Sequence, residues 1–248
     1  MARLSAHVYI QGVNVKYLNL DDHHKEAECS NDAIQSSELL VNRLSELQQQ
    51  LEGLQGAERI KPLLDSGYIL LDLVNRKDEA WQMGKEAFSL AIAAQNWLSA
   101  VEACDIIYQA EQDDAIAALA HGIWLGVTFP IDPELSVAML QHLVEETPDH
   151  SDGAGVAAAA ACFIVDLRAQ NKQKDDLGFF TGQLLGQVAR RHTNGACDTQ
   201  ELFEIWMDRL ELREPDKFLP RLAAILDVLV PAEQWWFDRD ALRALIPE

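Results

Sequence analysis

The feature that most constrains the fold is a series of helical segments that begins at Ser36 and continues to the end of the chain. Apolar residues recur in it at intervals of three and four, and short turns rich in Gly, Pro, Asn and Asp separate the segments. Asp132 as a cap and Pro133 in a first turn mark one helix start, and Pro148 marks the end of that helix. Because short connections make neighbouring helices antiparallel, the chain is predicted to be all-α and built from antiparallel helix pairs.

The N-terminal residues differ from this pattern. The stretch HVYIQGVNVKYLNL alternates β-branched and aromatic residues with polar ones around Gly12, which predicts one or two short strands. We therefore expect an extended or β-hairpin N-terminal arm over residues 1–20, an acidic linker over 21–35 and a single helical domain over 36–248. An isolated hairpin is marginal in water. The arm thus needs the body or a partner chain to pack on, with Tyr9 and Tyr17 as contact candidates.

Five leucines near the start of the helical region form a possible dimer seam. They fall at alternating intervals of four and three, at Leu40, Leu44, Leu47, Leu51 and Leu54. Two heptads of this kind support a homodimer, and the N-terminal arm is a second candidate contact. The same spacing is also typical of one helix packed on a neighbour in its own chain, and the sequence leaves both interpretations open.

The charge balance limits the classes of partner. Forty Asp and Glu residues against twenty Lys and Arg give a formal net charge of −20. Such a surface disfavours nucleic acid and anionic lipid, since affinity for phosphates comes mainly from basic side chains. It favours a protein partner with a basic or amphipathic segment, although solubility alone also explains the acidity.

The location is predicted from cysteine usage and hydropathy. No apolar run reaches the roughly 18 residues of a membrane span, and the first residues do not resemble a secretory signal. The four cysteines form no CxxC pair. These features predict a cytoplasmic protein with reduced thiols.

The stretch DDHHKEAEC, residues 21–29, carries the residue types that bind metals. His23, His24, Glu28 and Cys29 are its candidate ligands. Their spacing matches no metal motif considered, and no apolar residues surround them to fix a geometry. The preferred interpretation is a solvated acidic linker, and no cofactor is expected.

Catalytic motifs do not stand out. The patterns GxSxG, GxGxxG and GxxxxGK[ST] are absent, so a non-enzymatic protein-interaction or assembly factor is the leading prediction. The alternative is an enzyme with a buried polar site around His121 and Asp166, with or without a metal. A buried Asp166 would need a partner such as Arg190 or Arg191. The other interpretation is that the helix turns both Asp166 and Arg168 to solvent.

Three consecutive aromatic residues near the C-terminal end are candidates for partner binding. They are Trp235, Trp236 and Phe237. Three neighbouring side chains cannot all face the core from one helix, so at least one is expected at an interface. The alternative is a terminal segment that folds back over the core.

Two helical segments resemble the tetratricopeptide repeat. NWLSAVEACDIIYQA has Trp97, Ala100, Cys104 and Ile107 at positions like the packing positions of that repeat's second helix, and DPELSVAMLQHLVEETPD is similar. The resemblance covers residues 77–187. The usual Trp/Leu-Gly pattern of the first helices is missing, and the period varies. The resemblance implies an irregular, right-handed tetratricopeptide- or HEAT-like array that binds other proteins.

One turn resembles a second family. Glu146, Pro148, Asp149 and His150 are similar to the Glu-Pro-Asp-His turn of the cytosolic chaperones that mature molybdenum-containing redox enzymes, with Thr147 inserted. Those chaperones are all-helical, acidic and of similar length. The following helix lacks their usual acidic residues. The resemblance implies a maturation chaperone for a redox enzyme, a special case of the assembly factor.

Overall fold

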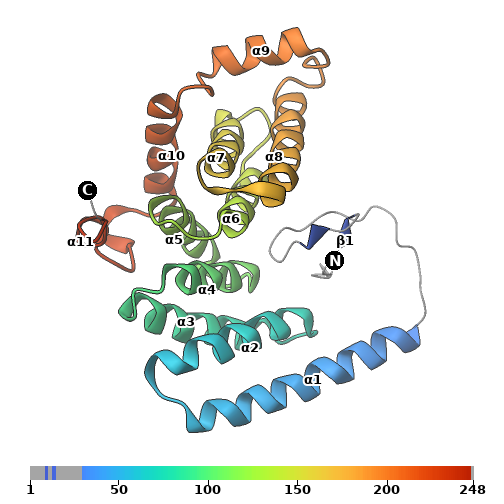
Figure 1. Ribbon diagram of the computed structural model, residues 1–248, viewed down its shortest axis with the longest axis vertical. Helices are drawn as coiled ribbons and strands as arrows, with labels where there is room; N and C mark the ends of the chain where they lie inside the picture. Colours follow the sequence, from blue (N-terminus) through green and yellow to red (C-terminus); the bar gives the residue numbers. More distant parts are fainter. Residues whose placement is uncertain (1–8, 11–12, 15–29, 247–248) are drawn as a thin grey trace. The chain divides into compact units, whose positions relative to one another are not determined.

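The computed structural model in Figure 1 describes residues 9–10, 13–14 and 30–246, and side chains from residue 37 to residue 246. The prediction of an all-α fold is confirmed for these residues, which hold helices apart from two two-residue strands. The helices are α1 Ser30–Gly53, α2 Ile60–Asp72, α3 Lys77–Ala93, α4 Trp97–Gln109, α5 Ala115–Thr128, α6 Pro133–Glu146, α7 Asp152–Arg168, α8 Asn171–His192, α9 Gln200–Arg209, α10 Pro215–Leu229 and α11 Arg239–Arg243. The 3₁₀ helices are η1 Gly56–Arg59 and η2 Ala232–Gln234.

The described N-terminal residues form two short strands. β1 (Tyr9–Ile10) pairs antiparallel with β2 (Val13–Asn14). The remainder of the predicted arm, including Tyr17, lies outside the described residues. Helix α1 begins at Ser30, so the predicted acidic linker is wrong for residues 30–35, which are helical. The helix starts earlier than the Ser36 cap predicted because Ser residues are tolerated inside an exposed helix as well as at its start.

Contacts between residues divide the chain into two compact units, where the sequence predicted one helical domain. The first unit holds the two strands, helices α1–α4 and the start of α5 up to Ala118. The second unit begins at Leu119 within α5 and includes α6–α11. None of the described helices is long and apolar enough to cross a membrane.

The first unit uses the predicted leucine seam internally. Helix α1 packs on α2, and Leu44, Leu47 and Leu51 are buried. Leu40 and Leu54 are half-buried. Three of the five leucines thus have an intramolecular partner, and a dimer through them stays a prediction.

Helices α2, α3 and α4 pack closely enough to require a glycine. A Cβ atom added to Gly84 of α3 would lie 2.8 Å from Ile107 Cγ1 and 3.3 Å from the carbonyl oxygen of Ala103, both on α4. Helix α2 contacts α4 as well as α3. In this unit α1 contacts α2, α2 contacts α3 and α4, and α3 contacts α4.

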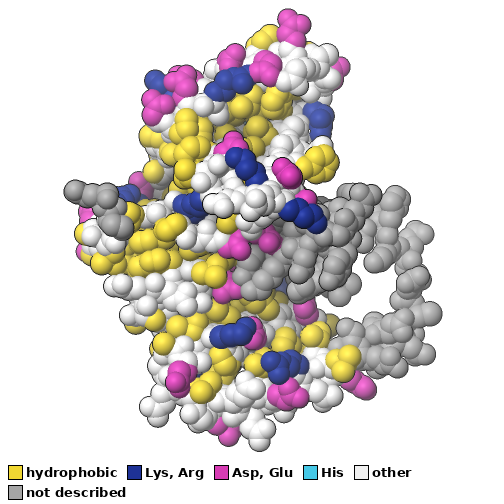
Figure 2. Space-filling model, in the orientation of Figure 1, with side chains coloured by type: hydrophobic (Ala, Val, Ile, Leu, Met, Phe, Trp, Pro, Cys, Tyr) yellow, Lys and Arg dark blue, Asp and Glu magenta, His cyan; other side chains and the backbone are white. Residues whose placement is uncertain are grey.

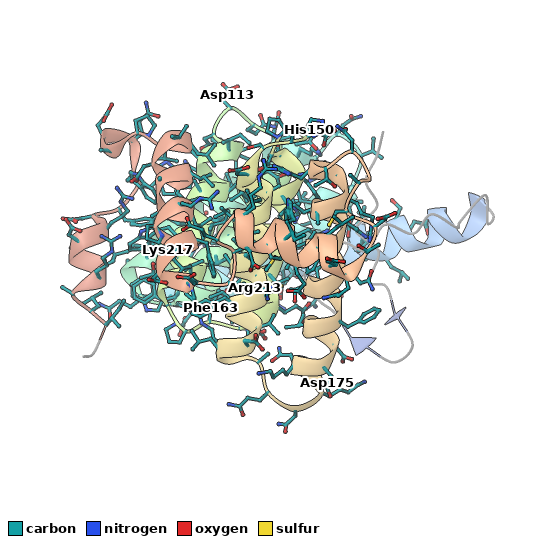
Figure 3. All side chains as sticks on the ribbon, turned by 90° about the horizontal axis from the view of Figure 1, so that it is seen from above. Asp113, His150, Phe163, Asp175, Arg213 and Lys217 are labelled. Carbon is teal, nitrogen blue, oxygen red and sulfur yellow. The ribbon has the colours of Figure 1, made fainter. Side chains whose placement is uncertain are left out.

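The second unit is built around α6 and α7. Helix α6 is buried from Pro133 to Val144, and its start confirms the predicted cap, because the Asp132 carboxylate accepts a hydrogen bond from the Glu134 N–H at 3.0 Å. Helix α7 packs against α6, α8 and α10, and Figure 1 shows it between the last two. Phe163 of α7, labelled in Figure 3, lies 6.0 Å from Phe218 of α10, measured between ring centroids.

Two arginines, each in the last turn of a helix, bind backbone carbonyls at the end of a helix in the preceding pair. Arg168, in the last turn of α7, donates to the carbonyls of Gly126 and Val127 at the end of α5, both at 2.6 Å. Arg191, in the last turn of α8, donates to the carbonyl of Val144 at the end of α6 at 3.0 Å. The last carbonyls of a helix have no partner within it. The two arginines therefore satisfy such groups on the preceding pair.

The helix pairs recur at a nearly regular interval. The first helices of three successive pairs, α3, α5 and α7, begin at Lys77, Ala115 and Asp152, which are 38 and then 37 residues apart. The second helices, α4, α6 and α8, begin 36 and then 38 residues apart. The observed interval is thus more uniform than the sequence alone indicated.

Candidate functional site

Helix α9 has one buried face and one exposed face. Trp206 and Met207 are buried, as is Leu210 just after the helix. On the other side, Leu202 is 43% exposed and Ile205 56% exposed. Large apolar side chains at this exposure in a charged helix are candidates for contact with another molecule.

Acidic residues surround these two apolar side chains. Glu201 lies four residues before Ile205 and Asp208 three residues after it, so helical spacing places all three on the same side. Residues 198–216 contain seven acidic residues and two arginines. Figure 2 shows acidic side chains gathered at the α9 end of the molecule. We call the exposed side chains of Glu201, Leu202, Ile205 and Asp208 the α9 face.

Both ends of α9 are fixed by side chains of its own segment. The Thr199 hydroxyl accepts a hydrogen bond from the Leu202 N–H at 3.3 Å, as a helix cap does. Arg213 follows the helix and pairs with Glu204 and with Asp208, the second at 2.6 Å. These pairs partly neutralise two carboxylates but leave the segment strongly acidic.

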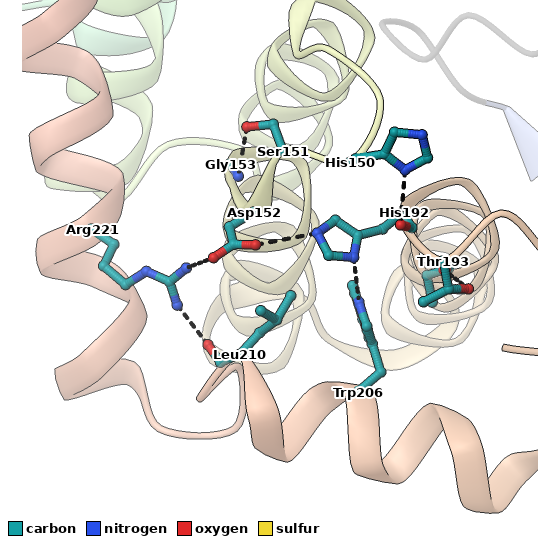
Figure 4. A network of polar contacts seen from close by, with 10 residues as sticks. His150, Ser151, Asp152, Gly153, His192, Thr193, Trp206, Leu210 and Arg221 are labelled. Carbon is teal, nitrogen blue, oxygen red and sulfur yellow. Dashed lines mark hydrogen bonds and ion pairs between the residues drawn. The ribbon is translucent and has the colours of Figure 1, made fainter. Parts of the chain in front are cut away.

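An indole–imidazole–carboxylate chain holds the buried face of α9 in place (Figure 4). The Trp206 Nε1–H donates to His192 Nδ1 at 3.2 Å, so that nitrogen carries no proton. The remaining ring proton is then on Nε2, which donates to the Asp152 carboxylate at 3.2 Å. His192 therefore joins α9 to the start of α7, with both ring nitrogens occupied. This leaves no ring nitrogen available as a general base.

Arg221 of α10 completes the same network. Its guanidinium donates to the carbonyl of Leu210, which follows α9, at 2.5 Å, and to the other Asp152 oxygen at 3.3 Å. Figure 4 shows Asp152 between His192 and Arg221. The network fixes the α9 face relative to α7, α8 and α10, all within the second unit.

The predicted chaperone-like turn lies beside this network. It connects α6 to α7, and Asp149 pairs with Arg191 at 3.2 Å. His150 has a positive φ of 65°, and its Nδ1 lies 3.0 Å from the carbonyl oxygen of His192. Both residues are exposed, and His150 is labelled in Figure 3. The turn is thus held against the end of α8.

The three aromatic residues predicted to bind a partner contact a buried histidine. Trp235, Trp236 and Phe237 are half-buried. Their ring centroids lie 4.8, 4.3 and 5.4 Å from that of His121 in α5. His121 itself is fully buried. The terminal segment thus folds back on α5, and a role of the half-exposed rings in partner binding stays a prediction.

The structure does not unite His121 and Asp166 in one buried polar site. The Asp166 side chain is 76% exposed, and it pairs with Lys174 at 3.2 Å. Arg190 or Arg191 was expected as its partner only if Asp166 were buried. Lys174 is close enough to pair with Asp166 because α8 begins at Asn171, just after α7 ends at Arg168. Arg168, two residues further along α7, is half-buried.

The described thiols are poorly suited to nucleophilic chemistry. Burial raises the pKa of the Cys104 thiol well above its usual value and also raises the pKa of Cys162 and Cys197. A thiol with a raised pKa is mostly protonated near neutral pH and is a weak nucleophile.

The predicted metal ligands His23, His24, Glu28 and Cys29 lie outside the described residues. So does Tyr17, and nothing is described of the Tyr9 side chain. Within residues 37–246, no group of three or more His, Cys, Asp or Glu side chains is arranged to hold a metal ion.

The α9 face and its supporting network were not predicted from the sequence. The residues concerned, above all His192, Trp206 and Arg221, come from three helices. One signal was available, since seven acidic residues within nineteen is the densest acidic stretch of the helical region. No protein-family model, curated protein or solved structure matches the chain.

Proposed function

We propose that this chain is a non-enzymatic, cytosolic protein-interaction or assembly factor. Its partner docks on the α9 face through a basic amphipathic segment. The observation that carries the proposal is the pairing of exposed Leu202 and Ile205 with an acidic rim on a helix held by hydrogen bonds. An apolar centre with a polar rim is the usual anatomy of a protein interface.

Charge complementarity favours a basic partner. The segment 198–216 has a formal charge of −5, from seven acidic residues and two arginines, within a chain of charge −20. A field of this sign accelerates encounter with a positively charged segment and repels nucleic acid. An amphipathic helix would add apolar side chains opposite Leu202 and Ile205 while placing Lys or Arg against Glu201 and Asp208.

The helix pairs support the same class of function. Successive pairs begin 36 to 38 residues apart, and arginines of one pair bind carbonyls of the pair before it. This supports an irregular tetratricopeptide- or HEAT-like array. Arrays of this kind commonly offer extended surfaces for protein binding.

A maturation chaperone for a redox enzyme is the more specific form of this proposal. Its support is the turn with Glu146, Pro148, Asp149 and His150, of which the last two are exposed and held by α8. An enzyme centred on His121 and Asp166 has less support, because Asp166 is exposed and paired with Lys174.

Affinity purification from an extract of the native organism, read by quantitative mass spectrometry, tests the proposal. We expect the double variant Leu202→Glu/Ile205→Glu to reduce the recovery of specific partners at least tenfold. The matched control is Val228→Glu, since Val228 is an apolar residue of α10 that is 82% exposed. Recovery should also fall as salt is raised, because exposed charge pairs are screened. Identical partner sets from all three proteins would contradict the proposal.

A further inference from the structure

Helix α8 exposes a large aromatic side chain on the side that faces away from the core. Phe179 is 72% exposed, whereas Leu177, Thr181 and Leu184 of the same helix are buried. Burying a phenylalanine side chain is worth about 1.5–3 kcal/mol, so leaving this ring in water forgoes that free energy. The ring is therefore a candidate for contact with another molecule.

Three glycines of α8 leave open space beside this ring. Gly178, Gly182 and Gly186 are four residues apart, so they follow one side of the helix. No described atom lies within 4 Å of a Cβ added to Gly178 or Gly182, and at Gly186 the nearest is Arg190 Nη1 at 3.8 Å. A glycine within a helix destabilises it by about 0.8–1 kcal/mol relative to alanine. Packing within the described chain does not require these glycines, so the space above them is available to a second molecule.

Charges of opposite sign lie at the two ends of the same side. Asp175, labelled in Figure 3, comes four residues before Phe179, and Arg190 comes four residues after Gly186; both charged residues are exposed. The intervals of 4, 3, 4 and 4 residues place Asp175, Phe179, Gly182, Gly186 and Arg190 on one side of the helix. We call these five residues the α8 face. Asp175 and Arg190 of one chain are about 22 Å apart along the helix, too far to pair with each other.

We propose that the α8 faces of two copies of this chain pack antiparallel across a twofold axis and form a weak homodimer. Phe179 of each copy then lies between Gly182 and Gly186 of the other. In that register Asp175 of each copy lies about 3 Å along the axis from Arg190 of the other, within reach of a guanidinium. One twofold axis thus satisfies the apolar contacts and both ion pairs, which is the self-complementarity that a symmetric interface requires.

Charge complementarity argues for a second copy as the occupant of the α8 face. The chain has a formal charge of −20, so two copies repel each other unless opposite charges meet where they touch. The α8 face carries one Asp and one Arg and has no formal net charge, whereas the segment 198–216 has a charge of −5. A basic partner is attracted to the α9 face and gains little from a neutral one. The α8 face is therefore the better surface for contact between two acidic chains.

The interface is small, so the dimer is weak. Stable interfaces bury at least about 1,200 Å² in total, and we expect a contact through one helix of each copy to bury less. The expected dissociation constant is on the order of 100 µM. The chain is then mostly monomeric at the low micromolar concentrations of unfolding experiments and dimerises where it is concentrated.

Sedimentation equilibrium of the full chain over about 5 to 500 µM, which brackets the expected constant, tests the dimer. The weight-average mass should rise from that of one chain toward twice that value. Phe179→Ser should raise the dissociation constant at least tenfold, because it removes the ring that enters the other copy. The matched control is Val228→Ser, at an apolar residue of α10 that is 82% exposed, and it should associate as wild type does. A monomer at every concentration, or equal association of all three proteins, would overturn the proposal.

Charge reversal distinguishes this antiparallel contact from any other dimer of the chain. Asp175→Arg alone and Arg190→Asp alone should each raise the dissociation constant at least tenfold, since like charges then face each other across the axis. The double variant Asp175→Arg/Arg190→Asp restores both pairs and should return the constant to within about threefold of wild type. The two positions are too far apart on one helix for rescue within a single chain. A double variant that associates as weakly as the single variants would overturn the antiparallel packing.

Discussion

Arg168 and Gly126 are 42 residues apart in the sequence, and a 2.6 Å hydrogen bond joins the guanidinium of the first to the carbonyl of the second. Arg191 makes the same kind of contact with Val144 across the second helices of the two pairs. Both arginines sit in the last turn of a helix and bind the last turn of the equivalent helix before it. The repetition indicates that helix pairs of the second unit are joined in one consistent way.

This relationship predicts that Arg168→Ala and Arg191→Ala each destabilise the second unit. The free energy of unfolding should fall by about 2 kcal/mol, since hydrogen bonds from a charged guanidinium to carbonyls at a helix end are lost. Burial lowers the pKa of the Arg168 guanidinium, as expected for a partly enclosed cation. Urea denaturation followed by circular dichroism measures the change. The control is Arg190→Ala, an exposed neighbour of Arg191. This control should lower the free energy of unfolding by less than about 0.5 kcal/mol. Equal losses at all three positions would argue against the hydrogen bonds of Arg168 and Arg191.

Gly84 predicts a packing penalty in the first unit. Gly84→Ala should destabilise that unit by about 2 kcal/mol, because the new Cβ would lie 2.8 Å from Ile107 Cγ1. Gly182→Ala in α8 is the matched control, since nothing lies within 4 Å of its added Cβ. That change should stabilise the chain by about 0.5–1 kcal/mol through helix propensity. Thermal unfolding distinguishes the two, and a neutral or stabilising Gly84→Ala would contradict the close approach of α3 and α4.

Trp206→Phe tests how α9 is held. The substitution keeps an aromatic ring in the buried position but removes the Nε1–H that His192 accepts. We expect faster hydrogen exchange across α9, equivalent to a loss of about 1–2 kcal/mol. Trp81→Phe is the control, because it removes an indole bond to Asp114 in the first unit. If both variants leave α9 exchange unaltered, the His192 contact does not hold the helix.

The cysteine pKa shifts predict slow alkylation of the native protein. The pKa values of Cys104, Cys162 and Cys197 are raised, so their thiolates form only at a higher pH than the thiolate of a free cysteine. These thiols therefore react slowly with alkylating agents at pH 8. Iodoacetamide should modify Cys104 at least 100-fold more slowly in native protein than in urea, with half-buried Cys162 reacting sooner. Peptide mass spectrometry resolves each site. Alkylation of Cys104 at the unfolded rate would show that α4 is not buried as described.

The helical segments were predictable because their signals are local. Asp132 and Pro133 define a start of α6 that the structure confirms, and the predicted turn at Gln95 has the positive φ that ends a helix. The start of α1 was less predictable. Residues 30–35 have Ala33 and Ile34 as their apolar residues. These two neighbours are too few to show a helical period, so the pattern does not distinguish a helix from a linker.

The contacts between residues far apart in the sequence could not be predicted from local sequence patterns. His121 and Trp236 are 115 residues apart, and Arg221 and Asp152 are 69 apart. Which aromatic ring meets which imidazole depends on how helices pack, and spacing along one helix does not report it. The apolar residues around His121 predict that its helix is buried, but they do not report its contact with the Trp236 backbone.

Site-specific photo-cross-linking in the native cell tests whether a partner docks on the α9 face. A photoreactive residue is placed at Ile205 on the α9 face or, as the control, at Val228 on α10, which is more exposed. We expect discrete cross-linked species from position 205 only, and we expect the cross-linked partner peptides to be rich in Lys and Arg. No cross-linked partner at position 205, or the same partners at both positions, would contradict it.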